Sequence, residues 1–372
     1  MRRGKPKKSG KNKTGLRPPA ILSEAGIRAM AQRDSGATRA RLRGIKMAIE
    51  TRLVTVFGGS GFVGRYIVRA LAARGYRVRV ALRRPHTAPD LKVMGRVGQI
   101  QLMQANLRFK ASIEQAVDGA DAVVNCVGLL FESGAQNFKS LHVQGARSIA
   151  EAAKAAGITN AVHISAIGAD EDSGSDYART KALGEAAVRG ALPGAAILRP
   201  SIIFGPEDEF FNKFAKMAQM SPALPLIGGG RTLFQPVYAE DVAKAVTRII
   251  TAGSAGQTYE LGGPGTYTFK ELLAYVLNVI DKKRILVPLP WPVAMAMGFA
   301  GELSGALPVI TPFLTRDQVT NLKTDNIVGE QAQGFDALGI QPEALEAIVP
   351  TYLERYRKYG QFHERLEDIK EN

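Results

Sequence analysis

The chain has 372 residues, of which 45% are hydrophobic and 22% charged, a composition typical of globular proteins. One cysteine, Cys126, excludes an intrachain disulfide and a cysteine-rich metal site, and four scattered histidines do not suggest a metal centre. The sequence holds no uncharged apolar stretch of about 18 residues, so no membrane-spanning helix is expected. The basic start is not followed by the apolar segment of a secretory signal.

The net charge of +15 is concentrated at the N-terminus. Residues 1–46 contain 14 Lys and Arg residues against Glu24 and Asp34, which leaves 35 basic and 32 acidic residues elsewhere. The body is nearly neutral, so a nucleic-acid-binding groove is not expected. We expect residues 1–46 to form a disordered basic extension. It is either an unstructured segment upstream of Met47, an Arg-rich transit peptide, or an arm for nucleic acid or anionic lipid.

A glycine-rich turn follows the first predicted strand. Residues 53–57 (LVTVF) form an apolar run that leads into GGSGFVG at 58–64, and apolar residues with helical spacing then continue to Gly75. Glycines at such a turn let backbone amides approach a pyrophosphate at the start of a helix. We therefore predict that a dinucleotide contacts Gly58, Ser60, Gly61, Phe62, Val63 and Gly64.

The end of the second predicted strand indicates which cofactor binds. Residues 77–82 alternate in hydrophobicity and lead to Arg83 and Arg84, and no Asp or Glu occurs between Gly75 and Thr87. An acidic residue here would bind the ribose 2′-hydroxyl of NAD, whereas arginine pairs with the 2′-phosphate of NADP. The sequence therefore favours NADP(H). The alternative is that the two arginines form a solvated strand end.

Strands and helices continue to alternate to about residue 205. The next predicted elements are 100–104, 110–117, 122–128, 136–156 and 160–165. This alternation predicts an α/β fold with a doubly wound parallel sheet of the Rossmann type, whose ligand crevice lies at the carboxyl ends of the strands. Further cofactor contacts are expected there, from Asn106, Leu107, Val127 and Gly128.

Tyr177 and Lys181 lie four residues apart, shortly after Ser165 at the end of the fifth predicted strand. On a helix this spacing places both side chains on one face. A nearby ammonium favours the phenolate and lowers its pKa from about 10. We therefore expect a Tyr177 phenol with a lowered pKa, suited to proton transfer beside a hydride donor.

These segments together resemble the extended branch of the short-chain dehydrogenase/reductase superfamily. The matching motifs span about residues 51–350: GGSGFVG (58–64), NCVG (125–128), YARTK (177–181), LRPSIIFGP (198–206) and QPVYAEDVA (235–243). The resemblance implies that Tyr177 and Lys181 flank the nicotinamide ribose. It also implies that Pro200 and Ser201 lie near the nicotinamide.

Two departures from the family pattern weaken a catalytic interpretation. Extended members usually carry two hydroxyl residues where this chain has Ser165 and Ala166, and they commonly have an Asn in the helix that here reads HVQGA at 142–146. If Ala166 occupies the position that polarises the substrate carbonyl, one hydrogen-bond donor is missing. Ser165, Tyr177 and Lys181 are then vestigial catalytic residues that mainly hold the cofactor.

Within the superfamily the chain is most similar to the dinucleotide-binding accessory subunits of respiratory complex I. The similarity lies in TRLVTVFGGSGFVGRYIVRAL, SDYARTKALGE, FNKFAKM and LPLIGGGRTLFQPVY. It implies an NADP(H)-holding subunit with little or no turnover. Such a subunit would bind other complex I subunits in the cytoplasm or at the cytoplasmic or matrix face of the respiratory membrane. The alternative is an active NADP(H)-dependent reductase, epimerase or dehydratase.

The alternation ends near Gly205. We expect a smaller C-terminal α+β cap from residues 206–234 and 263–359, while residues 235–262 return to the nucleotide-binding domain of 51–205 and residues 360–372 form a charged tail. Phe210, Phe211 and Phe214 form either a substrate wall or the cap core, and we expect the core. The glycines at 228–230 with Arg231 form either an anion-binding turn or a flexible surface loop.

The segment 285–301 carries no charge, and its prolines at 288, 290 and 292 exclude a regular helix at its start. It is expected to be cap core. The alternative is an exposed apolar face for a membrane-protein partner, formed by Trp291, Met295, Met297 and Phe299. A final helix is predicted at 343–359, with Leu345, Ile348, Val349, Tyr352, Leu353 and Tyr356 facing inward.

Overall fold

The computed structural model describes residues 52–132, 137–305 and 313–362. The predicted basic extension at 1–46 and most of the predicted charged tail at 360–372 lie outside the described residues.

Seven parallel strands form the main sheet, in the order β11-β6-β5-β4-β1-β2-β3. The chain builds outward from β1 through β2 and β3, and then returns to the other side of β1 with β4. This reversal is the switch point at which doubly wound sheets bind ligands. The strands are β1 (Leu53–Phe57), β2 (Arg77–Leu82), β3 (Ile100–Gln104), β4 (Ala122–Asn125), β5 (Asn160–Ile164), β6 (Ala196–Pro200) and β11 (Thr258–Leu261). The predicted doubly wound α/β fold is confirmed.

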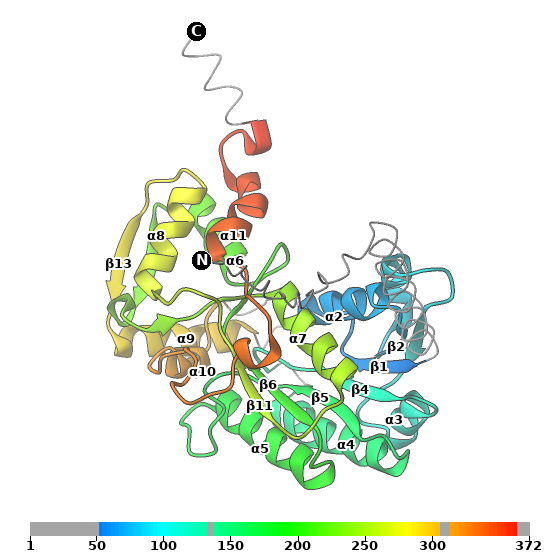
Figure 1. Ribbon diagram of the computed structural model, residues 1–372. Helices are drawn as coiled ribbons and strands as arrows, with labels where there is room; N and C mark the ends of the chain where they lie inside the picture. Colours follow the sequence, from blue (N-terminus) through cyan, green and yellow to red (C-terminus); the bar gives the residue numbers. More distant parts are fainter. Residues whose placement is uncertain (1–51, 133–136, 306–312, 363–372) are drawn as a thin grey trace, which may run out of the picture. The chain divides into compact units, whose positions relative to one another are not determined.

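Helices cover both faces of this sheet (Figure 1). One face carries α2 (Phe62–Ala73) and α7 (Ala239–Ala252), and the other carries α3 (Lys110–Val117), α4 (Ala146–Ala155) and α5 (Asp176–Ala191). Every residue of β1 and β4 is buried, as expected for parallel strands that are covered on both faces. The predicted bounds of β1, β2, β3 and α3 agree with the structure.

The predicted strand at 122–128 is too long, because β4 ends at Asn125. Cys126 N still donates to Phe57 O of β1 at 3.0 Å, but two later backbone amides have side-chain acceptors. Val127 N donates to Asn125 Oδ1 at 3.1 Å, and Leu129 N donates to His142 Nε2 at 3.0 Å. The predicted strand at 160–165 also ends one residue early, at Ile164.

The predicted helix at 136–156 is not a continuous α-helix. Its first part is a π-helical segment, η3 (Lys139–Gly145), and α4 follows directly; residue 136 lies outside the described residues. π-Helical turns inside α-helices often mark functional sites, and this one carries His142.

The remaining helices and strands build a second hydrophobic core, which includes Phe204, Phe210, Phe211, Phe214, Phe234 and Phe269. The expected core role of Phe210, Phe211 and Phe214 is confirmed by their ring contacts at 5.1 and 5.2 Å. The elements are β7 (Ile203–Phe204), α6 (Phe211–Met220), β8 (Ala223–Ile227), β9 (Leu233–Phe234), β10 (Val237–Tyr238), β12 (Tyr267–Thr268), α8 (Phe269–Val279), β13 (Ile285–Leu289), α9 (Trp291–Gly305), α10 (Arg316–Asn321) and α11 (Leu345–Leu353).

The apolar segment at 285–301 is partly packed in the core and partly exposed. Trp291 and Met295 pack against the second core, whereas Met297 and Phe299 are 38% and 52% exposed. As predicted, the start of the segment is not helical: it forms the strand β13, and α9 begins only at Trp291. No helix within the three described ranges is both long and apolar enough to cross a bilayer.

The glycines at 228–230 form a short 3₁₀ turn, and all three have positive φ. A methyl group at Gly228 would lie 2.2 Å from the Trp291 ring, and one at Gly230 would lie 2.4 Å from Leu226. The backbone of the turn is therefore packed against the second core at both ends, and only Gly229 faces open space. The final predicted helix corresponds to α11 and the 3₁₀ turn Glu354–Tyr356, with Leu345, Val349, Tyr352 and Leu353 buried.

Candidate dinucleotide-binding site

The chain passes from β1 into α2 through a tight turn. Gly58 has φ +80°, and Gly61 N donates to Gly58 O at 3.0 Å. A methyl group at Gly64 would lie 2.3 Å from the Gly58 oxygen, and one at Gly58 would lie 3.0 Å from the Cys126 backbone. Close packing of the turn against α2 and the end of β4 therefore requires glycine at both positions.

This turn fits a pyrophosphate. Gly61 is the N-cap of α2, where no side chain accepts a hydrogen bond, and the first turn of the helix holds no acidic residue. The backbone amides at a helix N-terminus lack intrahelical partners and carry partial positive charge. An anion placed here would satisfy donors that no side-chain cap satisfies.

Arg83 and Arg84 follow β2 at the same edge of the sheet. Ala81 pairs with Phe57, the last residue of β1, and β2 ends one residue later, so the two strands end at nearly the same level. Both arginines are exposed. Sequence reasoning missed a third arginine, Arg65, whose Nε donates to Ser60 O at 3.1 Å and whose guanidinium pairs with Asp90. Its place directly after the glycine turn was the only available signal.

The residues after β3 and β4 lie against other elements of the site. Asn106 Oδ1 accepts from Arg108 N at 3.1 Å, so one of the two acceptor positions of the amide oxygen is already used. Leu107 packs against η3, since a methyl group at Gly145 would lie 2.8 Å from it. A methyl group at Gly128 would lie 3.3 Å from Lys181 Nζ, so Gly128 admits the amine to the end of β4.

Tyr177, Lys181 and Ser165 come together at the carboxyl ends of β4 and β5. Lys181 Nζ donates to Ile164 O at 3.2 Å and lies 5.8 Å from the centroid of the Tyr177 ring. Ser165 is 4% exposed, and its hydroxyl has no hydrogen-bond partner among the described residues. Buried hydroxyls are nearly always hydrogen-bonded, so the Ser165 Oγ is available to a ligand.

The prediction that Lys181 lowers the pKa of Tyr177 is wrong. Burial raises the pKa of the Tyr177 phenol to about 12, and the charge of Asp317 adds to the increase. Burial also lowers the pKa of Lys181 to about 8. Desolvation of a phenolate outweighs the attraction of an amine that bonds to a backbone carbonyl. The phenol is therefore neutral at physiological pH.

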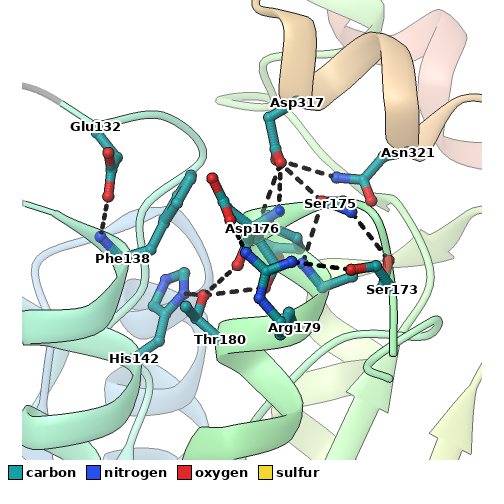
Figure 2. A network of polar contacts seen from close by, with 12 residues as sticks. Glu132, Phe138, His142, Ser173, Ser175, Asp176, Arg179, Thr180, Asp317 and Asn321 are labelled. Carbon is teal, nitrogen blue, oxygen red and sulfur yellow. Dashed lines mark hydrogen bonds and ion pairs between the residues drawn. The ribbon is translucent and has the colours of Figure 1, made fainter. Parts of the chain in front are cut away.

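His142 lies beside this group, in the helical segment where extended short-chain dehydrogenases/reductases were expected to carry an Asn. Its ring stacks on Phe138 at 5.2 Å and meets the Tyr177 ring edge-to-face at 5.5 Å. Since Nε2 accepts from Leu129 N, the network assigns the proton to Nδ1, which lies 3.1 Å from Thr180 Oγ1 (Figure 2). Burial lowers the pKa of His142 to about 2. The imidazole is neutral and both of its nitrogens are engaged.

Ser201 does not present a free hydroxyl. Its Oγ lies 2.7 Å from Asn326 Oδ1 and 2.9 Å from Asn326 O, and Asn326 Nδ2 donates to Ile167 O at 3.3 Å. Asn326 thus ties the ends of β5 and β6 together. No local pattern in the sequence points to this residue, because it lies 125 positions from Ser201.

Besides the dinucleotide site, the structure bears on two other kinds of site, a further pocket and a metal site. A surface pocket of about 340 Å³ is lined by Arg199, Thr258, Glu260 and Gln333 among others. It adjoins β6 and the edge strand β11, so it is separate from the glycine turn at β1. Among the residues that the structure describes, no cluster of His, Cys, Asp or Glu could hold a metal ion.

A family comparison identifies the family of the chain. The profile of the NAD dependent epimerase/dehydratase family matches residues 54–262, more than half of the chain, including the glycine turn, Tyr177 and Lys181. The chain belongs to the NAD dependent epimerase/dehydratase family. The resemblance to extended short-chain dehydrogenases/reductases found in the sequence is thereby confirmed.

Proteins with similar sequences match most of the chain. The chain is 35% identical to NADH dehydrogenase (ubiquinone) 1 alpha subcomplex subunit 9, mitochondrial, of Arabidopsis thaliana, over 91% of this chain and 84% of that protein. It is 34% identical to the Mus musculus protein of the same name, over 88% of this chain and 86% of that protein. The predicted resemblance to complex I accessory subunits is confirmed.

A solved structure confirms the fold of the NAD dependent epimerase/dehydratase family in this chain. The NADPH-dependent quinone oxidoreductase of Escherichia coli, complexed with NADPH, superposes with a TM-score of 0.64 at 20% identity. The superposition covers 81% of this chain and 99% of that one. In this fold Tyr177, Lys181, Ser165 and Gly128 lie together, whereas the Ser201 hydroxyl is turned to Asn326.

Proposed function

We propose that the protein is an NADP(H)-binding accessory subunit of respiratory complex I, with a structural or assembly role and little or no turnover. The observation that carries this proposal is the similarity to complex I alpha subcomplex proteins along about nine-tenths of the chain. Such coverage includes both the main sheet and the second core. The proposed partners are therefore other subunits of complex I.

Binding of NADP(H) is supported by the glycine turn and by the two exposed arginines after β2. The uncapped N-terminus of α2 offers amides to a pyrophosphate, and Arg83 and Arg84 offer guanidinium groups to a 2′-phosphate. The bound dinucleotide would supply hydride chemistry to the site. Lys181 and Ser165 offer a charged and a neutral donor at the ends of β4 and β5.

Low turnover is supported by three features of the residues around Tyr177. Ala166 follows Ser165 and supplies no side-chain donor to a carbonyl. Burial raises the pKa of the Tyr177 phenol to about 12, so it is a weak acid for proton transfer. His142 is held neutral with both nitrogens engaged, and it offers no substitute acid.

The relatives named above are mitochondrial proteins, and we place this protein at the matrix or cytoplasmic face of a respiratory membrane. Attachment would occur through protein partners. Free cytoplasmic protein is the alternative location.

A second candidate function is an active NADP(H)-dependent oxidoreductase, epimerase or dehydratase. The unpartnered Ser165 hydroxyl beside Lys181 and Tyr177 favours it, because an orphan donor in a family site suits a bound substrate. The test is NADPH oxidation over a panel of carbonyl and quinone substrates, with Tyr177→Phe as the matched variant. Equal and near-zero rates for both proteins would reject this candidate.

Native mass spectrometry tests the first candidate. The tagged chain is isolated from its own membranes in mild detergent, and its mass is measured with and without collisional release of ligands. We expect one NADP(H) per chain and attached complex I subunits. Recovery of a free chain without other subunits would contradict the accessory role, and recovery without a dinucleotide would contradict cofactor binding.

A further inference from the structure

A carboxylate from the C-terminal part of the chain caps the helix that carries Tyr177 and Lys181. Asp317, in the first turn of α10, accepts a hydrogen bond from Asp176 N at 2.6 Å and from the Ser175 hydroxyl at 3.1 Å (Figure 2). Tyr177 N lies 3.5 Å from the same carboxylate. Ser175 Oγ in turn accepts from Ala178 N at 3.2 Å.

The first turn of α5 therefore depends on a residue about 140 positions away in the sequence. A helix leaves its first amides without intrahelical acceptors, and Ser175, the local N-cap, serves only Ala178. Asp317 serves Asp176 and approaches Tyr177. Its negative charge also lies at the positive end of the helix dipole.

Asp317 is itself held in place on two sides. Thr315 and Gln318 form a capping box at the start of α10, which fixes the turn that carries Asp317. Arg316 donates from N and Nε to the Glu302 carboxylate of α9, at 2.8 and 2.7 Å. The contact with α5 is thus made from a helix that is capped at its start and hydrogen-bonded to α9.

The helix α5 has little freedom to move at its other contacts. Lys181 Nζ bonds to Ile164 O, and the Gly128 backbone lies directly beside that amine, where even one methyl group would lie 3.3 Å away. A shift of the first turn would displace Tyr177 first, because it lies within that turn, and Lys181 one turn later. Small displacements at such a site are costly for binding.

We propose that Asp317 is the positioning residue of this site: through the first-turn amides of α5 it sets where Tyr177 and Lys181 meet the nicotinamide ribose. The inference rests on the proposed binding of NADP(H). It adds a specific link between the C-terminal part of the chain and the cofactor. In the same geometry, burial raises the pKa of the Tyr177 phenol, and the charge of Asp317 adds to the increase.

The first test compares binding of the whole cofactor with binding of its adenosine half. The dissociation constants of NADPH and of adenosine 2′,5′-bisphosphate, which lacks the nicotinamide half, are measured by calorimetry for Asp317→Ala and Asp317→Asn. Loss of a helix cap predicts NADPH binding weakened by about fivefold to tenfold in Asp317→Ala. Binding of the bisphosphate should change by less than about twofold. Asp317→Asn keeps one acceptor oxygen and should therefore lose less affinity for NADPH than Asp317→Ala.

The matched control is Asp325→Ala. Asp325 Oδ1 accepts a hydrogen bond from Leu233 N, with a length of 2.8 Å, and this bond does not involve α5. It should lower the melting temperature without changing the affinity for NADPH. Wild-type affinity for NADPH in folded Asp317→Ala, or equal weakening of both ligands, would overturn the inference. If Asp317→Ala does not fold, Asp317→Asn and Ser175→Ala take its place.

A second readout does not need a bound cofactor. In carbon-13 NMR of labelled tyrosine, with the Tyr177 resonance assigned through Tyr177→Phe, Asp317→Asn should lower the phenol pKa and shift the resonance. Asp325→Asn should do neither. An unmoved Tyr177 resonance would reject the inference, whereas absence of NADPH binding by the wild-type chain would reject the proposed function alone.

Discussion

Lys181 Nζ donates a hydrogen bond to the carbonyl oxygen of Ile164 at 3.2 Å, so the amine of α5 lies at the end of β5, one residue before Ser165. Burial lowers the pKa of this amine to about 8. The candidate site therefore contains a cation that titrates just above physiological pH. In the proposed binding of NADP(H), its donors meet a ribose hydroxyl.

NADPH binding should weaken as the pH rises through about 8. Lys181 is an ammonium below its pKa and a neutral amine above it, and only the ammonium offers a charge-assisted hydrogen bond. We expect a dissociation constant that is constant below pH 7 and rises by up to tenfold per pH unit above about 8. The tenfold limit applies because one proton is linked to binding. Fluorescence titration from pH 6 to about 9.5 measures the dissociation constant. Lys181→Met should bind weakly at every pH, while the exposed control Lys154→Met should keep the wild-type curve.

Substitutions at two glycines of the turn should distinguish the effect of packing from that of ligand contact. Gly64→Ala places a methyl group 2.3 Å from the Gly58 oxygen, so it should destabilise the fold by about 1–3 kcal/mol and abolish NADPH binding. At Gly61 the nearest atom would be 3.4 Å away. Gly61→Ala should therefore keep the melting temperature and lose affinity, because the methyl group occupies space beside the pyrophosphate. Gly190→Ala, with nothing within 4 Å, is the control; retained NADPH affinity in Gly61→Ala would contradict the placement of the phosphate.

Arg83→Ala should reduce affinity for NADPH by roughly tenfold or more and leave NADH binding nearly unchanged. Only NADPH carries the 2′-phosphate that a guanidinium would bind. Calorimetry with both dinucleotides measures the ratio, and Arg84→Ala tests the neighbouring residue in the same way. Arg74→Ala, another exposed arginine just after α2, is the control. Equal losses for NADPH and NADH would show that these arginines do not contact the 2′-phosphate.

The protein should lose stability as the pH falls below about 6.5. Burial lowers the pKa of His142 to about 2 and that of His163 to about 3, so only the unfolded chain binds these protons between those values and 6.5. Each histidine then costs up to about 1.4 kcal/mol per pH unit. Urea unfolding at pH 7, 6 and about 5 measures the slope. His142→Gln should reduce it, the exposed His86→Gln should not, and a flat wild-type profile would contradict the neutral buried state.

The sequence by itself determined the parts of the fold that depend on local spacing. The apolar run at 53–57, the glycines after it and the alternation at 77–82 predict β1, the turn and β2 with their observed bounds. The i and i+4 spacing of Tyr177 and Lys181 places both on one face of α5. Hydrophobic periodicity and backbone freedom are properties of short segments, so they can be recognised before any tertiary contact is known.

Only the tertiary structure decided the chemistry of the residues in the site. The sequence predicted a lowered pKa for Tyr177 from its neighbour Lys181, but burial raises the pKa instead, and burial depends on every element packed around the phenol. The carboxylate that caps α5 comes from Asp317, and the partner of Ser201 is Asn326. Desolvation and contacts between residues more than 100 positions apart arise only when the chain has folded, because no local pattern encodes which surfaces meet.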